Sequence, residues 1–193
     1  MSATLLSQVA ASLQSPSGEW GLGPWKQGKV CQLAPVQHAG RTAYIQATPS
    51  TDPTTWVMCD PSVYGGTGQE SRKGILFGTS PEVIEDLKKI EAWAYSQMRD
   101  LQPNLDVIWK SVIRGTDVPS FKAKVWVDGK APCQCVDANN EPTPTPSTWG
   151  GLLAAPIFSL STYRQPDAAG ILLEVVGLKI LGTRHVKPQL AWW

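Results

Sequence analysis

An alternating pattern over 120–128, SFKAKVWVD, in which apolar residues alternate with two lysines and a tryptophan, constrains the fold of this chain more than any other feature. Because side chains alternate between the two faces of a strand, the phenylalanine, the alanine and the valines share one face. Lys122 and Lys124 share the other, as expected for a strand that packs on a core from one side. Trp126 lies with the two lysines, and an indole on such a face needs a cover or a ligand.

The clearest helix begins in the stretch TSPEVIEDLKKIEAWAYSQM, where Thr79 or Ser80 caps the first turn. Apolar residues recur every three or four positions along one stripe, which predicts a packed face. The opposite face, which includes Glu91, is charged and is predicted to be solvated. A second, shorter helix is predicted from Asn104 to Ile113.

The order of these elements predicts the fold class. The chain has 17 Gly and 16 Pro, which favour many turns and short strands. We expect a mainly β protein with one or two helices: an OB-fold-like five-stranded barrel with extra strands and a helical insertion over 80–114. This single domain covers 26–182, between a loosely ordered segment, 1–25, and a tail, 183–193. Strands are predicted over 28–34, 42–47, 54–59, 74–79, 121–127, 131–136, 155–164 and 170–182.

Charge and hydropathy limit the classes of function. The net charge is +1, which argues against a strongly basic protein but allows a local basic face. No run approaches the ~18 apolar residues of a membrane span. The start, MSATLLSQVA, lacks the basic region of a secretory signal. We therefore expect an intracellular protein without membrane contact, located in a host cell if it is viral.

Four cysteines are expected to be reduced, small apolar residues. Cys133 and Cys135 are two positions apart, so a disulfide between them would be strained. Only His38 and His185 are available as further metal ligands. The sequence therefore predicts no metal and no cofactor.

Aromatic and basic residues on several predicted strands suggest a ligand. Single-stranded nucleic acid needs both kinds, because phosphates bind lysine and arginine while unpaired bases stack on rings, at about 1–3 kcal/mol per base. Reading a duplex would instead need a helix with arginine, asparagine or glutamine in a groove, and the clear helix is largely acidic. Rings on several strands are also common in β proteins without this function. The candidate nucleic-acid-binding residues are Tyr44, Trp56, Arg72, Lys73, Lys122, Lys124, Trp126, Tyr163 and Arg164.

Residues 120–181 resemble the C-terminal half of the OB-fold single-stranded DNA-binding proteins of bacteriophages and large DNA viruses. The similar elements are FKAKVWVDGK, then CVDANN before a proline-rich loop, then GGLLAAPIFSLSTYRQPDAAGILLEVVGLKIL. The earlier order of elements agrees, so the outline covers 28–182. The resemblance implies a sequence-independent binder of single-stranded DNA in replication, recombination or repair. It also implies replication or recombination proteins as partners; RNA as a ligand and a homo-oligomer stay open.

The end of the chain departs from this resemblance. Some phage members end in a long acidic tail with a terminal aromatic residue, whereas this chain ends in VKPQLAWW. The aromatic end is present and the acidic run is absent. We therefore expect Trp192 and Trp193 to dock on a partner or a neighbouring subunit, or to pack on the barrel of their own chain.

Two other classes of function compete with DNA binding. A non-catalytic structural or protein-interaction β module, such as a virion component, fits the balanced charge and the many prolines. An enzyme is disfavoured because G-x-x-x-x-G-K-[ST], G-x-S-x-G and H-E-x-x-H are all absent from the sequence. The two histidines also lack acidic companions at a useful spacing, so we expect no catalysis.

Overall fold

The computed structural model describes residues 3–14, 18–28, 30–49, 54–62, 72–101, 106–115, 117–128 and 132–184. Within these ranges the chain forms two helices and fifteen strands, and the strands are linked in one hydrogen-bonded network. The helices are α1 (Leu6–Ser12) and α2 (Pro81–Leu101). The strands are β1 (Thr4–Leu5), β2 (Trp20–Leu22), β3 (Lys26–Gln27), β4 (Gln32–His38), β5 (Arg41–Thr42), β6 (Tyr44–Gln46), β7 (Trp56–Val57), β8 (Arg72–Gly78), β9 (Ile108–Lys110), β10 (Ile113–Arg114), β11 (Ser120–Trp126), β12 (Gln134–Val136), β13 (Pro142–Thr143), β14 (Leu152–Arg164) and β15 (Ala168–Thr183).

Five strands close into a ring at the centre of the fold. Their order is β14, β7, β8, β11 and β15, and pairing between β14 and β15 closes the ring. The two long strands stay paired over all of β14, with register shifts after Leu153 and Ile157 that bend the ribbon. The prediction of a mainly β, OB-like barrel with extra strands and a helical insertion is confirmed.

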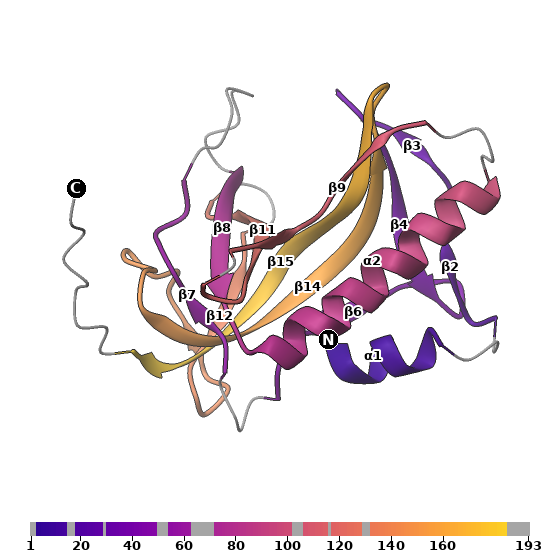
Figure 1. Cartoon of the computed structure of the whole chain (residues 1–193). Helices are drawn as coiled ribbons and strands as arrows, with labels where there is room; N and C mark the ends of the chain where they lie inside the picture. The colour runs from indigo at the N-terminus through magenta and orange to yellow at the C-terminus, as the bar shows by residue number, and fades with distance from the viewer. Residues whose placement is uncertain are drawn as a thin grey trace.

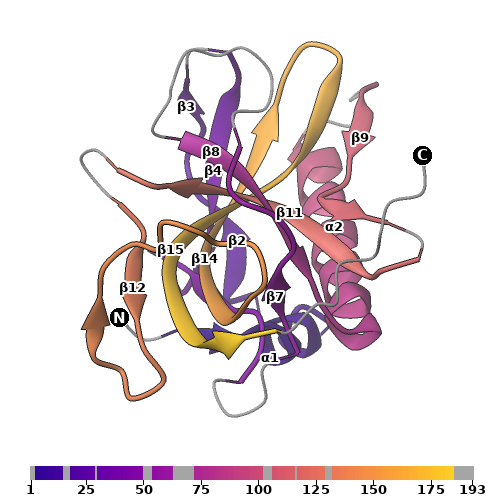
Figure 2. The same ribbon diagram turned by 90° about the vertical axis from the view of Figure 1, so that its left-hand side faces the viewer.

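The extra strands extend the barrel on both sides of this long hairpin. β4 and β6 pair with the outer edge of β14, and β9 pairs with the start of β15. The β14–β15 hairpin therefore rises between β4 on one side and β9 on the other, beyond β8 and β11 (Figures 1 and 2).

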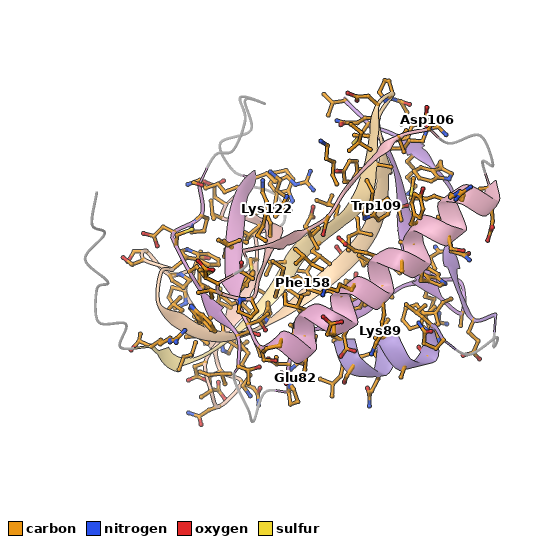
Figure 3. The ribbon with its side chains drawn as sticks, in the orientation of Figure 1. Glu82, Lys89, Asp106, Trp109, Lys122 and Phe158 are labelled. Atoms are coloured by element: carbon orange, nitrogen blue, oxygen red, sulfur yellow. The ribbon has the colours of Figure 1, made fainter. Side chains whose placement is uncertain are left out.

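Three phenylalanines from three strands of the ring fill the barrel. Phe77, Phe121 and Phe158 are at most 1% exposed, and their ring centroids lie 5.3 to 6.1 Å apart. Phe158 lies at the centre of the molecule in Figure 3. Burying a side chain of this size contributes about 1.5–3 kcal/mol relative to leaving it in water.

Helix α2 lies between β8 and β11 in sequence and packs its apolar stripe on the same core. Ser80 precedes its first residue and bonds to Glu82, and this bond lowers the pKa of the glutamate. Thr79 instead bonds to Thr55 through its buried hydroxyl, at 2.9 Å. Because α2 begins at Pro81, Ser80 rather than Thr79 occupies the N-cap position. The buried stripe contains Val83, Leu87, Ile90 and Ala94, as predicted.

The second predicted helix is wrong. Residues 108–110 and 113–114 form β9 and β10, and Asn104 lies outside the described residues. The stretch IWKSVIR is rich in β-branched and aromatic residues, and it pairs with the free edges of β15 and β11. Within the N-terminal segment, the described residues form β1, α1 and β2, and Leu6 and Val9 of α1 are buried.

Candidate nucleic-acid interface

The pairing register places several candidate residues on one face of the sheet. Tyr44 pairs with Ser159, Ser159 with Glu174, and Glu174 with Lys124. Directly paired residues of neighbouring strands project to the same side, so these four side chains form one row across β6, β14, β15 and β11. All four residues are half-buried. This face is therefore open to a ligand.

A groove of about 320 Å³ lies at one end of this face. Its walls come from β4, β8, β9, β10 and β11 and from the β14–β15 hairpin. Lys122 lies beside β8 on the side toward β9 (Figure 3). The ring of Tyr163 forms part of the wall, and five cationic residues line the groove: Arg72, Lys110, Arg114, Lys122 and Lys124.

The two lysines of the alternating strand are partly removed from water and close to other cations. Burial, and then the charge of Arg114, lowers the pKa of Lys122. Burial, and then the charges of Lys122 and Arg72, lowers the pKa of Lys124. The folded chain therefore holds these ammonium groups at a cost that an anionic ligand would relieve.

Trp126 is held at the edge of the groove by two neighbours. Its indole Nε1 donates to Oε1 of Glu174 at 3.1 Å, and Arg72 Cζ lies 5.7 Å from its ring centroid. Arg72 also donates to Oε2 of Glu174 at 2.5 Å. The carboxylate thus fixes the ring and one cation together, and it places a negative charge beside the groove.

The Tyr163 ring lies over Gly170, its paired residue on β15, where there is no side chain. Tyr163 pairs with Gly170, and a Cβ at that glycine would lie 3.0 Å from the tyrosine ring and 2.5 Å from the carbonyl oxygen of Lys110. Burial raises the pKa of the tyrosine hydroxyl, although the charge of Arg114 opposes the shift. Because Gly170 has no side chain, the Tyr163 ring and the backbone of Lys110 can both lie close to it in the wall of the groove.

Lys110 and Arg114 belong to the groove although the sequence analysis missed them. Glu91 on α2 holds the segment between them: its carboxylate accepts from Ser111 Oγ at 2.8 Å and from Val112 N at 2.7 Å. The prediction that Glu91 is solvated is wrong, since the residue is 8% exposed. The signal that would have placed Lys110 and Arg114 is the strand-like composition of IWKSVIR, which the helix prediction overrode.

Trp126 contacts Arg72 but does not itself line the groove, and four further predicted residues lie outside it. Lys73 and Arg164 directly follow groove residues on their strands, so they project to the opposite face. Arg164 lines a separate hollow beside Val30 and Gln32. Trp56 lies over Gly78, and Arg184 Cζ is 4.0 Å from its ring centroid. Tyr44 shares the sheet face but lines a second hollow.

Trp192 and Trp193 lie outside the described residues. Their docking on a partner stays a prediction.

The cysteines are free thiols, and Cys133 and Cys135 are buried. A hydrogen bond with Cys135 and burial raise the pKa of Cys133. Cys31 lines the groove, and burial raises the pKa of its thiol.

Among the described residues no cluster of three or more histidine, cysteine, aspartate or glutamate side chains is placed to hold a metal. In the same part of the chain no helix is long and apolar enough to cross a membrane.

The sequence matches no protein-family model and no curated protein. Among solved structures, the fold is similar to gp2.5, a single-stranded DNA-binding protein encoded by bacteriophage T7. The TM-score is 0.50 and the identity 12%, over 76% of this chain and 90% of that one. The single-stranded DNA-binding protein from bacteriophage Enc34, solved in complex with ssDNA, matches with a TM-score of 0.47 and 16% identity, over 87% of this chain and 98% of that one. The likeness to the T7 protein confirms the predicted resemblance at the level of the fold.

Proposed function

We propose that this chain is a non-catalytic protein that binds single-stranded DNA without sequence preference and protects or organises it in replication, recombination or repair. The groove of five cations with Tyr163 in its wall carries this proposal. Phosphates would bind the cations and unpaired bases would stack on the ring. The T7 protein with the same fold is itself a single-stranded DNA-binding protein.

The charge distribution supports a polyanionic ligand. The whole chain has a net charge of +1, yet five of its 17 lysines and arginines line one groove. Among the described residues, no carboxylate forms an ion pair with Lys110 or Lys124. Such a concentration of one charge is typical of a nucleic-acid footprint.

A flexible single strand fits this surface better than a duplex. The groove is built from strands and a long hairpin, and α2 presents acidic as well as basic residues to solvent. Duplex recognition commonly inserts a protruding helix or two-stranded ribbon into the major groove, whereas the five cations of this chain line a hollow. We therefore expect preference for unpaired strands, acting inside the cell that holds the DNA, with replication or recombination proteins as partners.

The test is a titration of the full chain with oligo-dT, oligo-rU and a duplex of equal length at two salt concentrations tenfold apart. Tryptophan fluorescence should fall on addition of oligo-dT. The logarithm of the association constant should decrease by ~0.7 for each phosphate neutralised. Failure to bind oligo-dT at the lower salt would contradict the proposal and favour a structural β module, whose size in solution would not change with oligonucleotide.

A further inference from the structure

A second ring lies beside a cation on β7, outside the groove. The Cζ atom of Arg184 is 4.0 Å from the ring centroid of Trp56. Trp56 is half-buried and Arg184 is exposed. The indole lies over Gly78, where a Cβ would clash with the ring. In the part of the chain that the structure describes, no carboxylate forms an ion pair with Arg184. The pair therefore offers an indole and a cation for which no carboxylate competes.

The pairing register places Trp56 on the same face as the lysines of the groove. Trp56 pairs with Gly78 of β8, and Gly78 pairs with Ser120 of β11. Directly paired residues project to the same side of a sheet. Lys122 is two residues from Ser120 on the same strand, so it projects to that side as well. The residues that alternate with this set, Phe77 among them, fill the barrel. The indole and the lysines therefore share the outer face of β7, β8 and β11, which lie side by side (Figure 1).

A small hollow of about 200 Å³ adjoins the groove in the direction of β7. Arg114 and Lys122 line both the hollow and the groove, and Leu76 lines the hollow alone. Met58 donates its backbone N–H to the carbonyl oxygen of Leu76 at 2.9 Å, and it is 37% exposed. From Lys122 to Trp56 the register crosses two strand-to-strand steps and two residues along the strand, a span of about 12 Å. The surface between the groove and the indole is therefore short, basic at one end and apolar in the middle.

We propose that Trp56 and Arg184 form a second subsite for the same single strand, which leaves the groove past Arg114 and Lys122 and crosses β8 to β7. A phosphate would bind Arg184, and the neighbouring base would stack on the pair, because bases stack both on aromatic rings and on guanidinium planes. This inference rests on the proposed function, and it adds a prediction about length. A short oligonucleotide fills the groove alone, and a longer one reaches Trp56.

The experiment measures the affinity of Arg184→Glu and of the unaltered chain for a series of oligo-dT lengths. The salt concentration is about 0.1 M, at which exposed charges more than about 10 Å apart are largely screened from each other. For short oligonucleotides the two proteins should bind equally. Beyond the length that spans the groove and Trp56, the variant should bind about tenfold more weakly, because a phosphate contact is replaced by repulsion.

The matched control is Arg41→Glu, the same substitution at another exposed arginine. Arg41 projects to the opposite face of the sheet and lines neither the groove nor the small hollow. This variant should follow the unaltered chain at every length. A loss by Arg41→Glu equal to that by Arg184→Glu would mean that only the net charge matters, and it would overturn the second subsite.

Photo-crosslinking provides a second readout on the unaltered chain. A long oligonucleotide with a single 5-iodouridine near one end should crosslink to Trp56, and a short one should not. Absence of this crosslink, an equal loss by Arg184→Glu at all lengths, or no loss at any length would each overturn the second subsite. If the unaltered chain binds no oligonucleotide of any length, the proposed function itself fails, and that outcome is distinct from the others.

Discussion

Trp126 donates its indole N–H to Glu174 at 3.1 Å. The ring that the sequence places on the polar face of its strand is therefore held by a carboxylate. The other oxygen of that carboxylate binds Arg72 at 2.5 Å. Arg72 is only partly satisfied, because its buried Nε has no hydrogen-bond partner among the described residues. Glu174 therefore restrains a ring and a cation that single-stranded DNA would otherwise engage.

Substituting Glu174→Gln should strengthen the binding of oligo-dT by about three- to tenfold. The amide oxygen can still accept from Trp126, while Arg72 loses its anionic partner and becomes available to a phosphate. The salt dependence should steepen by ~0.7 if one more phosphate is bound. Fluorescence titration at several salt concentrations measures both quantities. Glu141→Gln, at an exposed site away from the groove, is the control and should change neither. Weaker binding by Glu174→Gln would show that the carboxylate contributes to the ligand site.

The double substitution Lys122→Glu and Lys124→Glu should weaken binding by more than tenfold. Both side chains line the groove, and reversing their charges replaces attraction for phosphate with repulsion. The protein should stay folded, because neither side chain is in the core. Lys88→Glu with Lys89→Glu on the exposed side of α2 is a control of the same charge change. Equal affinities for the two double variants would place the DNA elsewhere.

Local patterns in the sequence were sufficient to predict the barrel strands and α2. Alternation placed Phe121 in the core and Lys122 outside, and the helical stripe placed Leu87 and Ile90 inside. These features depend on neighbours within a few residues. The closure of the ring also depends on pairings between segments far apart in sequence, β7 with β14 and β11 with β15, which periodicity cannot indicate. The order of the elements and the resemblance to phage proteins indicated the barrel instead.

The alternation of side chains along a strand could also have separated the candidate residues that face the groove from those on the opposite face. Arg72 and Lys73 are consecutive on β8, and Tyr163 and Arg164 are consecutive on β14, so only one of each pair can face the groove. Lys110 was missed because the chain from Asn104 to Ile113 was predicted to be helical, whereas residues 108–110 form a strand that pairs with β15. The role of Glu174 was likewise hidden, since its contacts come from residues 48 and 102 positions away.

Removing the Glu91 carboxylate should affect stability and binding together. Glu91→Ala loses the bonds to Ser111 Oγ and Val112 N, and the free energy of unfolding should fall by about 2–3 kcal/mol. The segment that carries Lys110 and Arg114 would loosen, so affinity for oligo-dT should also decrease. Chemical denaturation and fluorescence titration measure the two effects. Glu85→Ala on the exposed side of the same helix is the control. A stability loss without an affinity loss would remove Lys110 and Arg114 from the interface.

Gly170→Ala should distort the groove wall. Its new Cβ would lie 2.5 Å from the carbonyl oxygen of Lys110 and 3.0 Å from the Tyr163 ring, so both must move. We expect a loss of about 1–3 kcal/mol in stability and weaker binding of oligo-dT. Gly177→Ala on the same strand is the matched control, because its nearest neighbours would be at 3.6 Å, an ordinary contact. If the two variants bind equally well, the approach of Tyr163 to Gly170 does not shape the site.

Asp60 joins two loops, and its ionisation should appear in the pH dependence of stability. Its Oδ1 accepts the backbone N–H groups of Gly150, at 2.9 Å, and of Trp149, at 2.5 Å. These bonds lower the pKa of Asp60 below its value in the unfolded chain, about 3.9. A carboxylate with a depressed folded pKa contributes stability above the unfolded pKa and loses it as the pH falls through the folded pKa.

Asp60→Asn should therefore be less stable than the unaltered chain at neutral pH, because a neutral amide accepts weaker bonds than a carboxylate. The difference should be small, about 0.5 kcal/mol, since Asp60 is exposed and water weakens these bonds. The difference should shrink as the pH falls below about 4 and disappear once Asp60 is protonated in the folded state. Thermal melts across this range measure the difference directly. Glu141→Gln is the control, since that carboxylate accepts no hydrogen bond from the described residues. A difference that stays constant with pH would mean that the charge of Asp60 does not stabilise the loops.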